Sequence, residues 1–333
     1  MKKLRWGAII RVIISVGLMV FLLTQIHLEE LFQHNLDPGL FVIGILIFWG
    51  YMLAWALRWW LLLRGAGENV PFGTLFRTHL LGVFLSLLLP DMVGMDVGRM
   101  QEMSRVRDNK VGVVSTVLLD RLLGLGTLIM TALVSLLVLG YQYVGTTVLY
   151  LIIVLAVGLI VGWLVFFNKG LMKRFGWLLN LPFVNRFAST IKSLYVALHQ
   201  LQAKRRVLVW AVLMSEVSTL LAVTAVLFLA RALGDHTDTV FFYIMMPIVW
   251  VVVALPISIG GLGVREAAYV TLFTQVGMDS SLALALSLMH YGMQVMVGVV
   301  GGLLWVYASL QALRHPHTDT SMPQDFAAGE NRP

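Results

Sequence analysis

Long apolar stretches alternate with short polar ones along almost the whole chain. A helix that crosses a membrane needs about 20 mostly apolar residues. Five stretches meet this length: 39–63, 111–140, 147–167, 207–229 and 282–310. A sixth follows the basic positions 1–11 and ends at Ile26; we interpret it as a first span, because no small-residue cleavage site precedes His27. The pattern predicts an all-α polytopic membrane protein.

Two other apolar stretches, 79–89 and 264–276, are too short to cross, and each adjoins a break in the pattern. Pro90 follows the first, and the segment 256–263 with its proline and glycines precedes the second. Proline and glycine disfavour continuous helix, and non-helical backbone at membrane depth survives only inside protein or beside a wet cavity. We therefore predict two re-entrant hairpins, the first entering from the cytoplasm and the second from outside. The tip of the first would hold Pro90, Gly94, Asp96 and Arg99.

The two breaks resemble each other. Residues 89–99, LPDMVGMDVGR, and residues 255–265, LPISIGGLGVR, share the pattern L-P-x-x-x-G-x-x-x-x-R. Paired glycine and proline interruptions in the two halves of a membrane protein indicate a transport site at a repeat interface. We predict two pseudo-symmetric halves, with the opposed re-entrant hairpins around a central polar cavity.

Charge gives the orientation. The segment 168–206 carries many Lys and Arg residues and no acidic residue, which predicts a cytoplasmic location. Apolar residues recur at helical spacing within 187–201, as in an amphipathic helix at the inner surface.

We expect an integral membrane domain over 1–313, divided into halves of about 1–167 and 207–313 by the linker 168–206. Residues 314–333 would be a disordered tail. Both termini would be cytoplasmic, in a bacterial-type inner membrane.

The composition supports this class. The chain of 333 residues is 59% hydrophobic and 12% charged, whereas soluble domains are about 45–50% apolar and about 25% charged. We assign the net charge of +7 to cytoplasmic loops, and expect no nucleic-acid partner. Cysteine is absent, which excludes thiolate chemistry and disulfides. No phosphate loop, HExxH motif or nucleophile elbow is present, so we expect no metal or cofactor, and a transporter rather than an enzyme.

Ionisable residues inside membrane segments are costly and are candidates for function. Arginine suits a phosphate, because its guanidinium stays charged and can donate two hydrogen bonds. Broken helices add backbone N–H groups and a positive helix end. We therefore hypothesise that arginines line a cavity for an anionic lipid headgroup, with glycines of the two breaks beside them. The residues are Arg99, Arg121 and Arg265, with Gly94, Gly260, Gly261 and Gly263.

The acidic residues fit two compatible interpretations. They balance charge or carry protons during transport, or they neutralise the arginines and hold the helices together. The residues are Asp96, Asp120, Glu216 and Glu266. Neighbours on a helix project about 100° apart, so Asp120 and Arg121 are each expected to pair elsewhere.

Two features of the last apolar segment have simpler explanations. His290 is expected to be a neutral, hydrogen-bonded packing residue rather than a proton relay. Gly298, Gly301 and Gly302 are expected to be positions of close helix packing.

Three motifs resemble a known family: LLPDMVGMDVGR at 88–99, VLLDRLLGL at 117–125 and LPISIGGLGVREAA at 255–268. They are similar to the lysylphosphatidylglycerol synthase transmembrane region, the flippase-like UPF0104 group that includes the YbhN-type proteins. The first motif departs from the family pattern L-P-G-x-x-G-G-D-x-x-R, because Asp91 and Met95 stand in place of glycines. In the aminoacyl-phosphatidylglycerol synthases, the similar domain flips a lipid made by a fused synthase domain. The resemblance implies lipid flipping or binding, and not lipid aminoacylation.

These observations predict a lipid translocase. Its cargo would be a phosphate-bearing lipid, such as a modified phospholipid or a polyprenyl-phosphate-linked sugar. Two alternatives stay open. One is a membrane glycosyltransferase-type enzyme, in which Asp91 and Asp96 hold a divalent ion with a sugar diphosphate. The other is a non-transporting partner that delivers lipid to a membrane enzyme.

Overall fold

The computed structural model describes residues 36–88, 91–106, 109–139, 146–167, 204–254 and 263–314. All regular elements within these ranges are α-helices, as predicted. The predicted first span, the linker helix, residues 255–262 of the second break and the tail beyond Arg314 lie outside the described residues. The division into two halves therefore stays a prediction.

The long helices match the predicted spans. They are α3 (Pro38–Gly65), α6 (Lys110–Leu139), α7 (Thr146–Phe167), α11 (Arg205–Ala232) and α14 (Ser280–Arg314). Among the described helices, four are long and apolar enough to cross a membrane, and they lie in α3, α6, α11 and α14. The chain is therefore a multi-pass α-helical protein.

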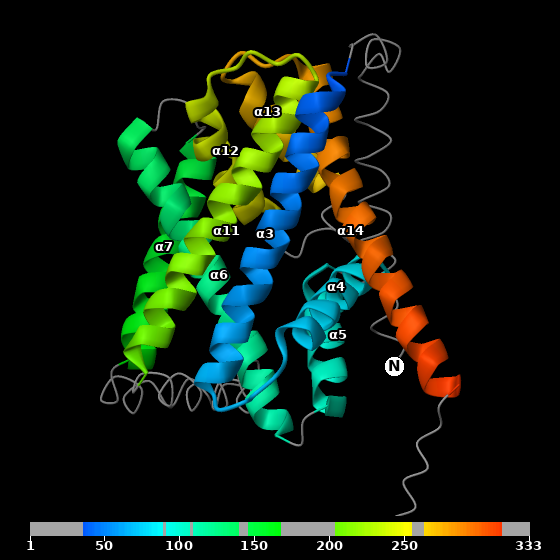
Figure 1. Ribbon diagram of the computed structural model, residues 1–333. Coiled ribbons are helices and arrows are strands. Elements are labelled where there is room, and N and C mark those ends of the chain that lie inside the picture. The colour runs from blue at the N-terminus through cyan, green and yellow to red at the C-terminus, as the bar shows by residue number, and fades with distance from the viewer. Residues whose placement is uncertain are drawn as a thin grey trace, which may run out of the picture.

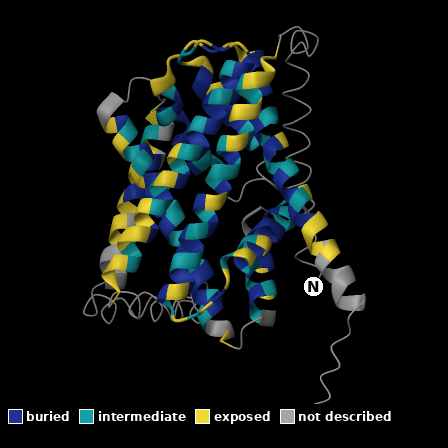
Figure 2. Ribbon diagram, in the orientation of Figure 1, coloured by how far each residue is buried: buried dark blue, intermediate teal, exposed yellow. Residues whose placement is uncertain are grey.

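Helices α3 and α11 run side by side in opposite directions through the length of the molecule (Figure 1). Their upper ends are joined where the backbone N–H of Asp37 donates to the carbonyl of Ala232 at 2.9 Å. Gly44 permits close contact, since a Cβ there would lie 3.4 Å from the Ala225 carbonyl oxygen. The outer face of α11 exposes apolar side chains such as Trp210 and Leu213 (Figure 2). An exposed apolar helix face is suited to contact with lipid.

Four shorter helices form two pairs. The first pair is α4 (Phe72–Leu88) and α5 (Asp91–Val106), and the second is α12 (Thr239–Val253) and α13 (Val264–Thr274). The members of each pair pack against each other. In Figure 1 the first pair lies beside the lower half of α3 and the second lies near the upper ends of α3 and α11. Their re-entrant course and the pseudo-symmetry of the halves stay predictions.

The two breaks differ in detail. The second is confirmed as an interruption, because α12 ends at Val253 and α13 begins only at Val264, after Gly263 with φ +78°. The expected non-helical tip at the first break is wrong for Gly94 and its neighbours, because α5 already begins at Asp91. Gly94 serves helix packing instead: a Cβ there would lie 2.4 Å from the Leu85 carbonyl oxygen of α4.

The glycines of α14 confirm the predicted close packing. A Cβ on Gly301 would lie 2.1 Å from the Leu80 carbonyl oxygen, and one on Gly298 would lie 2.5 Å from the Leu87 side chain. A Cβ on Gly302 would meet the Phe84 ring at 2.9 Å. All three contacts are with α4, so glycine allows α14 to cross the first short pair at close range (Figure 1).

Candidate functional site

A cavity of about 310 Å³ lies among α3, α4, α5, α6, α11, α12 and α14. This volume is at the lower end of the roughly 300–1,000 Å³ of small-molecule pockets. Most of its wall is apolar or aromatic, and the charged and polar exceptions gather on a few helices. Its charged described residues are Arg58, Asp96, Arg99, Asp120 and Arg121. Of the three predicted arginines, Arg99 and Arg121 are among the described residues that line this cavity.

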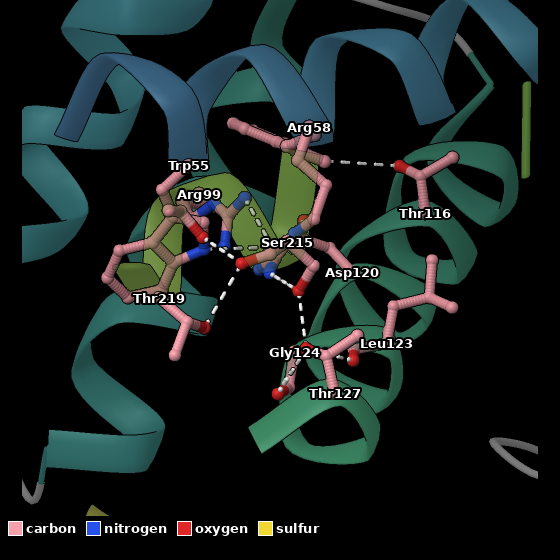
Figure 3. A network of polar contacts seen from close by, with 12 residues as sticks. Trp55, Arg58, Arg99, Thr116, Asp120, Leu123, Gly124, Thr127, Ser215 and Thr219 are labelled. Carbon is pink, nitrogen blue, oxygen red and sulfur yellow. Dashed lines mark hydrogen bonds and ion pairs between the residues drawn. The ribbon is translucent and has the colours of Figure 1, made fainter. Parts of the chain in front are cut away.

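Asp120 of α6 is the centre of the charged group, with 1% of its surface exposed. Its Oδ1 accepts from Arg58 Nε at 2.7 Å, and its Oδ2 accepts from Arg99 Nη2 at 3.0 Å. The indole N–H of Trp55 also donates to Oδ2 at 3.3 Å (Figure 3). A buried carboxylate is tolerated when it is paired and hydrogen-bonded in this way.

Further contacts hold the two arginines. Arg58 Nη1 donates to Ser215 Oγ at 2.7 Å, and this hydroxyl lies 2.6 Å from Thr127 Oγ1 (Figure 3). Gly124 leaves space for Arg58, since a Cβ there would lie 3.1 Å from the guanidinium nitrogens. The guanidinium carbon of Arg99 lies 4.0 Å from the centroid of the Trp59 ring, a cation–π arrangement. One network thus joins α3, α5, α6 and α11.

A second ion pair lies on the same wall and is more accessible. Arg121 Nη1 donates to Asp96 Oδ2, and the two side chains are 28% and 15% exposed. The expectation that Asp120 and Arg121 pair elsewhere is therefore confirmed. Among the described residues that line the cavity, three arginines face two aspartates. With both aspartates ionised, these described residues together carry a net positive charge.

Arg265 lies apart from this group. Glu266 Oε1 accepts from Arg265 Nη2 at 2.6 Å, and Oε2 accepts from the Gly263 backbone N–H at 2.5 Å. The Arg265 guanidinium lies 4.3 Å from the Tyr291 ring centroid. Neither Arg265 nor Glu266 is among the described residues that line the cavity. Glu266 occupies the position at the start of α13 that an external anion would take, and it neutralises Arg265 within the same helix rather than joining two helices.

The other predicted residues are distributed differently. Glu216 is half-buried in α11, and among the described residues its hydrogen-bond partner is Thr131 of α6, at 3.0 Å. Gly263 is the N-cap of α13, and Gly94 packs on α4. Gly260 and Gly261 lie outside the described residues.

His290 is hydrogen-bonded as expected, its Nδ1 lying 2.9 Å from the Tyr269 hydroxyl, and it also lines the cavity.

Sequence reasoning missed Arg58. Trp59 and Trp60 beside it are typical of a helix end at the lipid interface, where an arginine needs no functional explanation. The structure places Arg58 inside α3 with 4% of its surface exposed. The signal was available: the apolar residues 59–63 continue the helix beyond Arg58, so this arginine lies within the segment and not at its end.

Apolar helices of membrane-spanning length around a buried, charged cavity define a multi-pass membrane protein with an internal polar site. The family model of the lysylphosphatidylglycerol synthase TM region matches residues 8–302, and the chain belongs to that family. The resemblance seen in the three motifs is thereby confirmed. No curated protein matches the chain.

Proposed function

We propose that this protein binds the headgroup of a phosphate-bearing lipid in the cavity and moves that lipid across the inner membrane. The observation that carries the proposal is the excess of arginine over aspartate among the described residues that line a cavity between apolar helices. Positive charge in a low-dielectric environment attracts an anion more strongly than it would in water. A phosphate would complete the charge balance of the wall.

A guanidinium carries five N–H donors and can bind more than one acceptor at a time. Arg121 is the more accessible, while Arg58 and Arg99 are held in place by Asp120. We therefore expect Arg121 to meet the phosphate first and the Asp120 network to fix the position of the other two guanidinium groups. Preorganised donors of this kind suit a phosphate.

Two short helix pairs, one beside the lower half of α3 and the other near its upper end, support movement rather than static binding. We propose that these pairs are re-entrant hairpins of an inverted repeat, and that they open the cavity alternately to the two sides. The cytoplasmic location of both termini belongs to the same proposal. Asp96 and Asp120 would remain paired with the arginines when no lipid is bound.

The test is a reconstitution into vesicles. The protein would be inserted into vesicles that contain a fluorescently labelled phosphatidylglycerol or a labelled polyprenyl phosphate, and the fraction of label accessible to an external quencher would be followed. We expect faster exchange between leaflets than in protein-free vesicles, and slower exchange with Arg121→Gln. Arg206→Gln is the matched control, because Arg206 is exposed at the start of α11.

Each outcome has a meaning. Exchange equal to that of protein-free vesicles for both lipids would overturn the translocase proposal. Release of a new lipid product in the presence of a divalent ion and an activated sugar donor would favour the enzyme alternative. Co-purification with a membrane enzyme, without exchange or product, would favour the lipid-delivering partner.

A further inference from the structure

We propose that the phosphate of the cargo carries a sugar ring, and that the aromatic wall of the cavity binds this ring. The proposal rests on the proposed function and narrows its substrate class to a lipid-linked sugar phosphate. The aromatic wall consists of Tyr51 and Trp55 of α3 and Trp250 of α12, all of which line the cavity and are partly exposed.

The three rings reach the cavity from two helices. Tyr51 and Trp55 lie one helical turn apart and are stacked, with centroids 5.6 Å apart and planes at 25°. Trp250 reaches the same cavity from another helix, with its ring 6.2 Å from that of His290. A pyranose ring has an apolar face of C–H groups, which packs on the electron-rich face of an aromatic ring. The headgroups of simple phospholipids have no such face.

Polar groups accompany the aromatic wall. Ser218 and Thr219 of α11 line the cavity, and their hydroxyls donate to the Ser215 carbonyl at 2.7 and 3.1 Å. Since each donor is used, the oxygens remain acceptors for hydroxyl groups of a ligand. Gln294 of α14 adds an amide that both donates and accepts. A quaternary ammonium group would use the aromatic rings but could not use these hydrogen-bonding groups, which favours a hydroxylated ligand.

The aromatic wall adjoins the charged group directly. The Trp55 indole N–H donates to Asp120 Oδ2 at 3.3 Å, and Asp120 holds Arg58 and Arg99 (Figure 3). One cavity is therefore lined by both guanidinium groups and aromatic rings. A phosphate at the arginines would place a sugar attached to it beside Trp55 and Trp250, with its hydroxyls toward Ser218, Thr219 and Gln294.

The test compares two lipids that differ only in the sugar. Binding of decaprenyl phosphate and of decaprenyl phosphate glucose to the full chain in detergent would be measured by microscale thermophoresis. We expect the glucosylated lipid to bind about three- to tenfold more tightly, the size of one aromatic contact. Trp250→Leu should bring this ratio close to one, and Trp250→Phe should retain most of it. Trp210→Leu is the control, because Trp210 is exposed on the outer face of α11.

Gln294→Leu is a second variant on another helix and should also lower the ratio, which keeps the test valid if Trp250→Leu does not fold. Equal binding of the two lipids by the wild type would overturn the sugar proposal and leave the translocase proposal standing. Phosphatidylglycerol binding as tightly as the glucosylated lipid would also overturn it. Failure to bind any of the three phosphate lipids would instead contradict the proposed function itself.

Discussion

Arg58 Nε donates to Asp120 Oδ1 at 2.7 Å, and the two residues, 62 positions apart in the sequence, are 4% and 1% exposed. This ion pair connects α3 to α6, and Arg99 extends it to α5. Two charges taken out of water cost several kcal/mol each unless they remain together. The position of the charged group therefore depends on Asp120 more than on any other side chain in it.

Asp120→Asn should destabilise the protein by about 3–5 kcal/mol, because it leaves Arg58 and Arg99 buried without their anion. The measurement is the midpoint of thermal unfolding in detergent, followed by tryptophan fluorescence. Arg58→Met should also destabilise, but the double variant should be more stable than the sum of the two changes predicts. Purely additive losses would contradict a direct coupling between the two residues.

The contact of α14 with α4 gives a prediction with a matched control on the same helix. Gly301→Ala places a Cβ within 2.1 Å of the Leu80 carbonyl oxygen, so the helices must separate, at a cost of about 1–3 kcal/mol. A Cβ on Gly292 meets nothing within 4 Å. Gly292→Ala should therefore leave Tm unchanged or raise it slightly, since alanine is the better helix former. Equal effects of the two substitutions would show that this packing is not close.

The sequence was most informative where one physical requirement dominates. Apolar stretches of membrane length became α3, α6, α7, α11 and α14, because the bilayer fixes how long such a helix must be. The glycines of α14 were recognised as packing positions because small residues are what close membrane helices require. The break before Gly263 was recognised because several glycines and a proline occur together there.

The sequence does not show which side chain each charged residue pairs with. Asp120 pairs with residues of two other helices, and spacing along α6 says only that it does not pair with Arg121. Arg265 and Glu266 are neighbours like Asp120 and Arg121, yet they pair with each other, because Glu266 turns back to the Gly263 N–H at the start of α13. Gly94 looked like part of a non-helical tip, but its lack of a side chain serves the contact with Leu85.

Substitution of Arg265 should mainly lower stability, whereas substitution of Arg121 should mainly weaken lipid binding. Arg265 is buried and held by Glu266, so Arg265→Gln should lower Tm more than Arg121→Gln does. Arg121 is the accessible arginine of the cavity, so Arg121→Gln should weaken binding of decaprenyl phosphate more than Arg265→Gln does. Thermal unfolding and thermophoresis on the same two variants separate the roles. A larger binding loss in Arg265→Gln would restore Arg265 as a headgroup ligand.

His79 gives the last prediction. Its side chain is fully buried in α4, and neither ring nitrogen has a hydrogen-bond partner among the described residues. Its ring packs edge-on against Trp55, with centroids 5.0 Å apart. His79→Phe keeps an aromatic ring at this contact and removes two buried polar atoms, each of which costs about 1–3 kcal/mol when unsatisfied. We therefore expect Tm to stay the same or rise. His79→Ala removes the ring as well and should lower Tm, because it leaves a hole beside Trp55. If His79→Phe lowered Tm as much as His79→Ala, the imidazole nitrogens would have to make a stabilising contact of their own, and His79 would join the charged group as a functional residue.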